Sequence, residues 1–207
     1  VNASSEEGRL AVNGMSYHAR DGVNANSAVV VTVTPEDYKK LVLPKLSQKA
    51  IEKYEESDAL LGMEFQRRLE EAAYKAGNGK IPVQLFKDFC VNQPSKGPER
   101  IMPQMKGCYT WGNVRAIFPE ELAQAIVEGI LSFGKHLKGY SRPDALISGV
   151  ESRTSSPVRI LRDNGFQSEL GGLYPCGEGA GYAGGITSAA IDGLKVAQAI
   201  AEEYLPF

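Results

Sequence analysis

The stretch GLYPCGEGAGYAGGITSAAIDGLKVAQAI (172–200) decides how the fold of this chain is understood. A short apolar run, a glycine-rich turn and a small-residue amphipathic run follow one another, which predicts a strand, a loop and a helix that starts near Gly185. Glycines let a backbone approach a ligand closely, and the amides at a helix start carry positive partial charge. The stretch therefore predicts a site for an anionic or electron-rich group.

The glycine-rich turn favours one kind of ligand. Its five glycines fall within nine positions: Gly177, Gly179, Gly181, Gly184 and Gly185. Glu178 can accept hydrogen bonds from the hydroxyl groups of a sugar or ribityl chain, but it would repel a phosphate placed directly on it. The P-loop pattern GxxxxGK[ST] is absent from the sequence. The turn thus suits the polyol and ring of a cofactor better than a gripped phosphate, and the alternative is a turn that serves packing alone.

The bulk composition limits the class of protein. The chain has 207 residues, 43% of them hydrophobic, and a formal net charge of −2. This balance offers no attraction for nucleic acid or an anionic membrane, so we expect neither as a partner. The three cysteines are far apart and lack zinc-ligand spacing, which predicts free thiols, no metal site and a cytoplasmic location. The first residue is Val1, which permits the interpretation that the chain is a piece of something longer.

The remaining patterns predict an α+β fold. The β-branched run 29–33 predicts a strand within a hairpin or strand pair, and a helical pattern runs from about Pro44 to Ala76. A second amphipathic helix is expected after Pro119, and residues 144–163 return to β character around a polar turn. We expect a β-rich substrate-binding domain at 1–155 with a helical insertion at about 44–78. Residues 156–207 form a separate strand, glycine loop and helix.

Two further groups of polar residues are candidates for chemistry. Arg153 and Arg159, together with Arg162, could orient a carboxylate or phosphate, because arginine forks recognise both groups. The alternative is a solvated hairpin with surface ion pairs. His18 is a weak acid/base candidate beside Arg20, since a lone histidine is more often structural than catalytic.

Three blocks of the sequence carry a resemblance to a known family. These are NGMSYHARDGVNANSAVVVTV (13–33), LISGVESRTSSPVRILRD (146–163) and the glycine-rich stretch itself. Together they resemble the C-terminal half of the bacterial FAD-dependent dehydrogenases, also described as NAD(FAD)-utilising dehydrogenases. The architecture that this resemblance implies is similar to the glutathione-reductase-like FAD fold. In that fold an N-terminal GxGxxG segment binds the ADP part of FAD. No GxGxxG occurs in this chain.

The resemblance implies a flavin site shared with a missing segment. It implies that Gly177, Glu178 and Gly179 lie beside the ribityl and phosphate region of FAD. It further implies that Gly184, Gly185 and Ile186 bring the helix start to the pyrimidine edge of the flavin, where positive potential stabilises the reduced form.

The implied protein is an oxidoreductase whose N-terminal FAD-binding segment is the partner of this chain. NAD(P)H is a candidate electron donor or acceptor, the small-molecule substrate is unknown, and the chain alone is expected to be inactive. The alternative is a standalone module that binds a nucleotide or sugar phosphate without redox activity.

Overall fold

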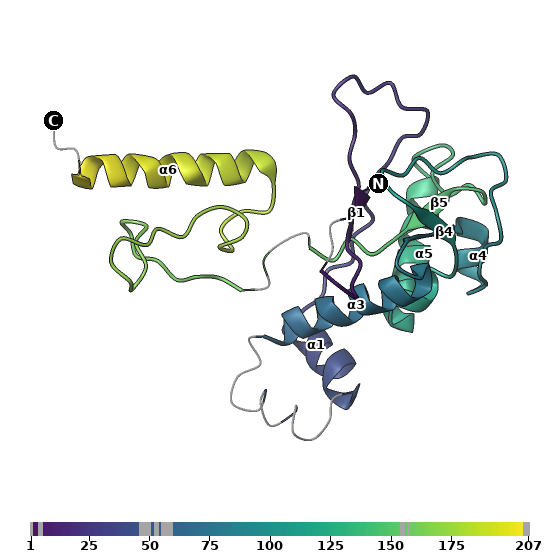
Figure 1. Ribbon diagram of the computed structural model, residues 1–207, viewed down its shortest axis with the longest axis horizontal. Helices are drawn as coiled ribbons and strands as arrows, with labels where there is room; N and C mark the ends of the chain where they lie inside the picture. The colour runs from purple at the N-terminus through teal and green to yellow at the C-terminus, as the bar shows by residue number, and fades with distance from the viewer. Residues whose placement is uncertain are drawn as a thin grey trace.

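The computed structural model describes residues 2–3, 6–45, 51, 54, 60–153, 156 and 158–204, and it confirms the α+β class. Helices and strands alternate irregularly along the chain (Figure 1). The strands are β1 (Asn2–Ala3), β2 (Val12–Asn13), β3 (Ile81–Leu85), β4 (Tyr109–Trp111) and β5 (Leu146–Ser148). The helices are α1 (Pro35–Val42), α3 (Leu61–Gly77), α4 (Phe86–Cys90), α5 (Glu120–Gly134) and α6 (Ile186–Tyr204), with 3₁₀ turns η1 (Leu43–Lys45) and η2 (Arg115–Ile117).

The three-stranded sheet has β3 at its centre, parallel to β4 and antiparallel to β5. All five residues of β3 are buried, as expected for a strand covered on both faces. Gln84 is the polar member, and it is fully bonded. Its side chain donates to Gln93 O at 2.7 Å and to Asn113 Oδ1 at 3.1 Å, and it accepts from the Arg115 amide at 2.9 Å. These bonds offset the cost of burying an amide, and they attach η2 to the sheet.

Helix α3 packs against α1, β3 and η2. The helical pattern expected up to Ala76 is confirmed here, and Leu61, Phe65 and Leu69 form its buried apolar stripe. The helix ends at Asn78 in the left-handed conformation, φ 47°. Just before it, Gly77 has no Cβ, and a Cβ there would lie only 3.1 Å from the ring of Pro82. The chain can therefore turn sharply from α3 into the buried strand β3.

Other helix predictions differ in their outcome. The helix after Pro119 is confirmed as α5, and the terminal helix is confirmed as α6. Part of the helix expected from Pro44 to Ala76 lies outside the described residues, at 46–50, 52–53 and 55–59. Within the described part, Ile51, Tyr54 and α3 are helical, as expected, whereas α1 lies before the predicted range.

Two strand predictions are wrong. Residues 29–33 are extended but belong to no ladder, and residues 172–176 likewise form no strand. A β-prone sequence indicates that its side chains would pack well on a pleated sheet. A strand forms, however, only where a second segment supplies the backbone hydrogen bonds. No described segment pairs with either run.

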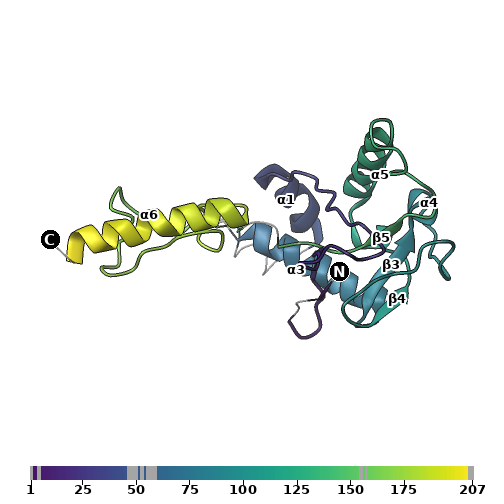
Figure 2. The ribbon, with the colours of Figure 1, turned by 90° about the horizontal axis from the view of Figure 1, so that it is seen from above.

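The C-terminal residues occupy a place of their own in the molecule. Figures 1 and 2 both show α6 and the loop before it lying beside each other and extending away from the body that contains α1, α3 and the sheet. The hydrogen bonds found for 158–204 join these residues to one another and to Ser156, among the residues that the structure describes. The domain division at 155 stays a prediction.

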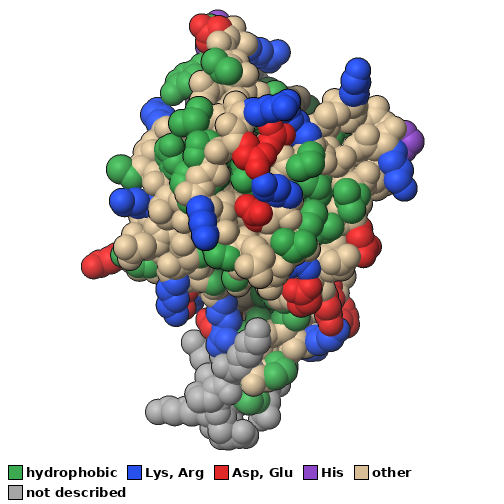
Figure 3. All heavy atoms as spheres, turned by 90° about the vertical axis from the view of Figure 1, so that its right-hand side faces the viewer, with side chains coloured by type: hydrophobic (Ala, Val, Ile, Leu, Met, Phe, Trp, Pro, Cys, Tyr) green, Lys and Arg blue, Asp and Glu red, His purple; other side chains and the backbone are tan. Residues whose placement is uncertain are grey.

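Two surface features bear on the expected partners. Of the helices in the described ranges, none is long and apolar enough to cross a bilayer. Figure 3 views the molecule from the right-hand side of Figure 1, and on that face basic and acidic side chains are interspersed. This face therefore has no extended basic patch of the kind that binds nucleic acid.

Candidate functional site

The glycine loop (residues 177–185) is closed by its own backbone. The Tyr182 amide donates to Gly177 O, and the Gly181 amide donates to Glu178 O, each at 3.0 Å. Gly177 and Gly181 have φ of 71° and 84°, a region that side chains with a Cβ rarely adopt. A Cβ on Gly181 would lie 2.6 Å from Val158 O. Two of the glycines are thus required by the shape of the loop itself.

Arg162 holds the loop against α6. Its guanidinium donates to both carboxylate oxygens of Asp192, at 2.7 and 2.9 Å, and to Pro175 O at 2.7 Å. The same carboxylate accepts the Gly177 amide at 2.9 Å. We call this set the Arg162 clamp: Arg162, Asp192 and the Gly177 amide. The hydrogen bonds from Arg162 and Gly177 lower the pKa of Asp192 to about 2.

Aromatic rings complete the support of the clamp. The guanidinium of Arg162 lies 3.5 Å from the ring centroid of Tyr182 and 4.7 Å from that of Phe166. Phe166 has φ of 66°, an unusual conformation for a bulky residue. Because the Arg162 side chain is only 9% exposed, these stacked contacts are largely desolvated and hold it in one position.

Other positions of the loop are open. A Cβ on Gly179 would meet no atom within 4 Å, and a Cβ on Gly185 would meet only Ser188 Oγ, at 3.8 Å. The amides of residues 186–188 at the start of α6 have no acceptor among the described residues. Ile186 is 93% exposed, and Gly184 is exposed as well. These free donors and bare backbone positions fit the edge of a flavin ring, and Glu178 is half-buried beside them.

The structure separates the two predicted arginine anchors. Arg159 joins the glycine loop: its Nε donates to Gly181 O at 2.9 Å, and its guanidinium lies 4.9 Å from the Tyr182 ring centroid. Arg153 instead binds the carboxylate of Glu70 on α3, with two hydrogen bonds of 2.8 Å. The geometry thus leaves Arg159 beside the candidate site and commits Arg153 to an internal ion pair.

Glu70 is a buried carboxylate that needs this pairing. It is 1% exposed, and Ser152 Oγ donates to it at 2.7 Å in addition to Arg153. Burial raises the pKa of Glu70, but the hydrogen bonds from Arg153 and Ser152 outweigh burial, so the pKa ends below its ordinary value. The carboxylate therefore stays charged and ties α3 to the chain after β5.

His18 lies in neither arrangement. It is exposed, next to a turn in which the Arg20 amide donates to Tyr17 O at 3.0 Å. Residues 14–26 form the loop that projects from the body near β1 in Figure 1. The structure gives His18 no contact with the glycine loop among the residues that it describes.

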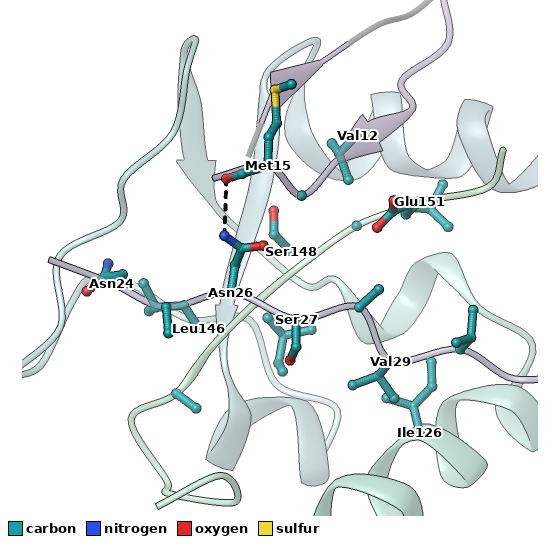
Figure 4. Close-up of a pocket in the computed structure, with 18 of the residues that line it drawn as sticks. Val12, Met15, Asn24, Asn26, Ser27, Val29, Ile126, Leu146, Ser148 and Glu151 are labelled. Atoms are coloured by element: carbon teal, nitrogen blue, oxygen red, sulfur yellow. Dashed lines mark hydrogen bonds between the residues drawn. The ribbon is translucent and has the colours of Figure 1, made fainter. Parts of the chain in front are cut away.

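A wide hollow in the body was missed by sequence reasoning. It has a volume of about 2460 Å³ and is lined by residues 14–33 together with parts of α3, α5 and β5 (Figure 4). Val29, Ile126 and Leu146 supply apolar lining, and Asn26 donates from Nδ2 to Met15 O at 3.1 Å at its edge. Val29, Val31 and Val33, at every second position of the run 29–33, were the sequence signal that could have indicated an apolar lining.

The fold and the loop define an α+β protein with a glycine loop, closed by its own backbone, ahead of its terminal helix. The family model described as FAD-dependent protein, C-terminal domain-like matches residues 1–154, and the chain belongs to this family. An "Uncharacterized protein" of Clostridium beijerinckii (strain ATCC 51743 / NCIMB 8052) is 48% identical over 207 residues, which cover 99% of this chain. These residues are 36% of that protein, so the chain spans about a third of the length of the curated relative that it matches.

Gly181→Ala tests whether the loop conformation is fixed by Gly181. We expect a loss of about 1–3 kcal/mol in the unfolding free energy of 158–204, because the Cβ meets Val158 O and the φ is positive. Gly179→Ala is the matched control and changes stability by less than about 0.5 kcal/mol. Urea unfolding followed by residue-level amide exchange measures both. Equal effects of the two substitutions would contradict this account of the loop.

The Arg162 clamp predicts a dependence of stability on pH. Since the pKa of Asp192 is lowered to about 2, its contribution is fully present above about pH 4 and is lost as the pH falls through 2. Asp192→Asn removes this dependence, whereas Glu169→Gln, at an exposed site in the same segment, retains it. Unfolding free energies measured from pH 7 to pH 2 provide the comparison. Parallel profiles for the wild type and Asp192→Asn would refute the role of the clamp.

Arg153→Ala leaves the buried Glu70 carboxylate with Ser152 as its remaining side-chain donor among the described residues. We expect a loss of about 2 kcal/mol in unfolding free energy, because an under-compensated buried charge is costly. Lys40→Ala, which breaks the exposed Lys40–Glu121 pair, is expected to cost less than about 0.5 kcal/mol. Chemical denaturation of both variants measures the difference, and comparable small losses would show that the Glu70 pair contributes little.

Proposed function

We propose that this chain is part of an FAD-dependent oxidoreductase and that residues 158–204 complete its flavin site. The observation that carries the proposal is membership of the FAD-dependent protein family over residues 1–154. The flavin, when bound, would supply hydride or electron transfer. The residues of this chain would bind it, orient it and set the potential around it.

The open end of α6 supports a specific orientation of the flavin. Its free amides and helix dipole present positive potential, which favours the negative charge of a reduced flavin near the pyrimidine edge. Gly184, Gly185 and Ile186 lie at this end. Glu178, which lies earlier in the glycine loop, would accept hydrogen bonds from ribityl hydroxyl groups. Arg159 lies on the Gly181 side of the loop and is our candidate anchor for an acidic substrate or for NAD(P)H.

A second part of the same protein would cover this site. The apolar side chains of 158–204 are exposed to an unusual extent, as shown by Ile160, Leu161, Leu170, Leu173, Ile186, Ile191 and Leu194. The chain has an accessible surface of 13318 Å². A compact monomer of the same mass exposes about 9,400 Å². This surplus of total surface, together with the exposed apolar side chains, calls for a partner, and we propose an N-terminal segment that carries GxGxxG.

The proposal also covers the substrate-binding part of the protein and its location in the cell. We propose that residues 1–155 form the substrate-binding part, with the hollow contributing to it, and that the protein acts in the cytoplasm. The alternative is a module that binds a nucleotide or sugar phosphate without redox activity. The experiment must distinguish this module from the proposed oxidoreductase.

The test is FAD binding by the longer protein and by its Gly185→Ala variant. A Cβ at residue 185 is tolerated by this chain, so a loss of affinity reports the close approach of the ligand. We expect at least a tenfold rise in Kd, or about 1.4 kcal/mol. Gly193→Ala is the matched control on α6, because a Cβ there meets no atom within 4 Å.

Two results would overturn the proposal. The first is a folded wild-type protein that contains no flavin and cannot be loaded with one. The second is tight binding of nucleotides or sugar phosphates with no reduction of added FAD by NADH or NADPH, which would establish the module instead.

A further inference from the structure

Residues 28–33, which we call the valine strip, have the side-chain pattern of a strand that packs on one face. Val29, Val31 and Val33 are half-buried against the hydrophobic core, whereas Val30 is 70% exposed and Thr32 is also exposed. This alternation with a period of two is what a strand on the surface of a core produces. The side chains of the strip therefore already occupy the positions of a strand.

The backbone of the strip lacks what a strand requires. Its amide and carbonyl groups have no hydrogen-bond partner among the residues that the structure describes. The next residue is different, because the Thr34 amide donates to Asp37 Oδ2 at 2.8 Å and Thr34 O accepts the Tyr38 amide. Backbone polar groups on half-buried apolar chain are costly without partners, and an unpaired strand is a template for pairing.

The space beside the strip is large enough for another segment. The hollow of about 2460 Å³ is lined by the strip, by Ile126 of α5 and by Leu146 of β5 (Figure 4). Pockets for one small ligand have volumes of about 300–1,000 Å³. A hollow several times larger, next to unpaired backbone, has the dimensions of a docking surface for polypeptide.

We propose that the valine strip is the docking edge for one extended strand of the same polypeptide, supplied by the part of the longer protein outside these 207 residues. The strand would pair with the backbone of 28–33 and bury apolar side chains in the hollow. The inference rests on the longer protein of the proposed function, but it does not depend on FAD.

Two observations favour this occupant over a second copy of the chain. In the Clostridium beijerinckii relative, 64% of the protein lies outside the matched part (100 − 36), which is ample length to supply a strand. Uncovered surface also occurs at two separate places, the hollow and the exposed apolar side chains of 158–204. One covering segment of the same polypeptide can serve both places, because it need not obey the symmetry of a dimer.

Residue-level amide hydrogen exchange in the longer protein tests the proposal. Successive amides of a strand point to opposite edges, so pairing on one edge protects every second amide. We expect exchange rates within 29–33 to alternate by at least about tenfold between odd and even positions. Val83 is the reference for a strand paired on both edges, and residues 21–23 are the reference for exposed loop.

Three outcomes would overturn the proposal. Exchange in 29–33 as fast as in 21–23 would show that no strand docks. Uniform protection without alternation would show simple covering rather than strand pairing. Alternating protection that disappears on dilution would identify a second copy as the occupant. Alternation in a protein that cannot be loaded with FAD would leave this inference standing while the proposed function fails.

A matched pair of variants provides a second measurement. Proline removes one amide, so Val30→Pro and Val31→Pro each delete a donor, but only one of them faces the docked strand. We expect the variant that removes the protected amide to abolish the alternation and the other to keep it. Equal retention of the alternating pattern in both variants would exclude strand pairing.

Discussion

The buried carboxylate of Glu70 fixes the centre of the body. Its side chain binds Arg153 and Ser152, and its backbone carbonyl accepts the Leu10 amide at 3.0 Å. One residue of α3 thereby joins the segment before β2 and the segment after β5, which are distant in sequence. An isolated buried charge is penalised by several kcal/mol, so α3 needs the segment after β5, and the Leu10 bond adds the segment before β2. The direction in which the chain leaves the sheet follows from this constraint.

A second arginine–carboxylate pair sets the other end of the same stretch. Arg162 binds Asp192 as Arg153 binds Glu70, and in both cases the planar fork meets a carboxylate on a helix. The arginines of the block 146–163 thus have unequal roles. Arg153 and Arg162 are committed to internal pairs, whereas Arg159 lies beside the loop with a bond from its Nε to a backbone carbonyl. A cluster of arginines in the sequence predicts anion recognition, but Arg159 is the member that has no carboxylate partner among the described residues.

Sequence reasoning succeeded where the signal is local. The stripe of α3, the first turn of α5 and the start of α6 all depend on residues a few positions apart, and the glycine loop is closed by bonds within itself. It failed for the strands at 29–33 and 172–176, because a ladder depends on a partner that periodicity does not reveal. The partners of Arg153 and Arg162 lie 83 and 30 residues away, so no spacing rule could identify them.

The candidate site combines an ordered glycine loop with an exposed face of α6. The positive φ angles of Gly177 and Gly181 are held by internal hydrogen bonds and by the Arg162 clamp, so a ligand would meet a loop whose ordering has already been completed. The outward face of α6 has the opposite character, since Ile186 and Leu194 are exposed with no covering side chains among the described residues. A preformed loop favours affinity, and an uncovered apolar helix favours association with further protein. Under the proposed function, ligand binding and the docking of the remaining polypeptide would be coupled, because a segment that covered α6 would also exclude water from the ligand.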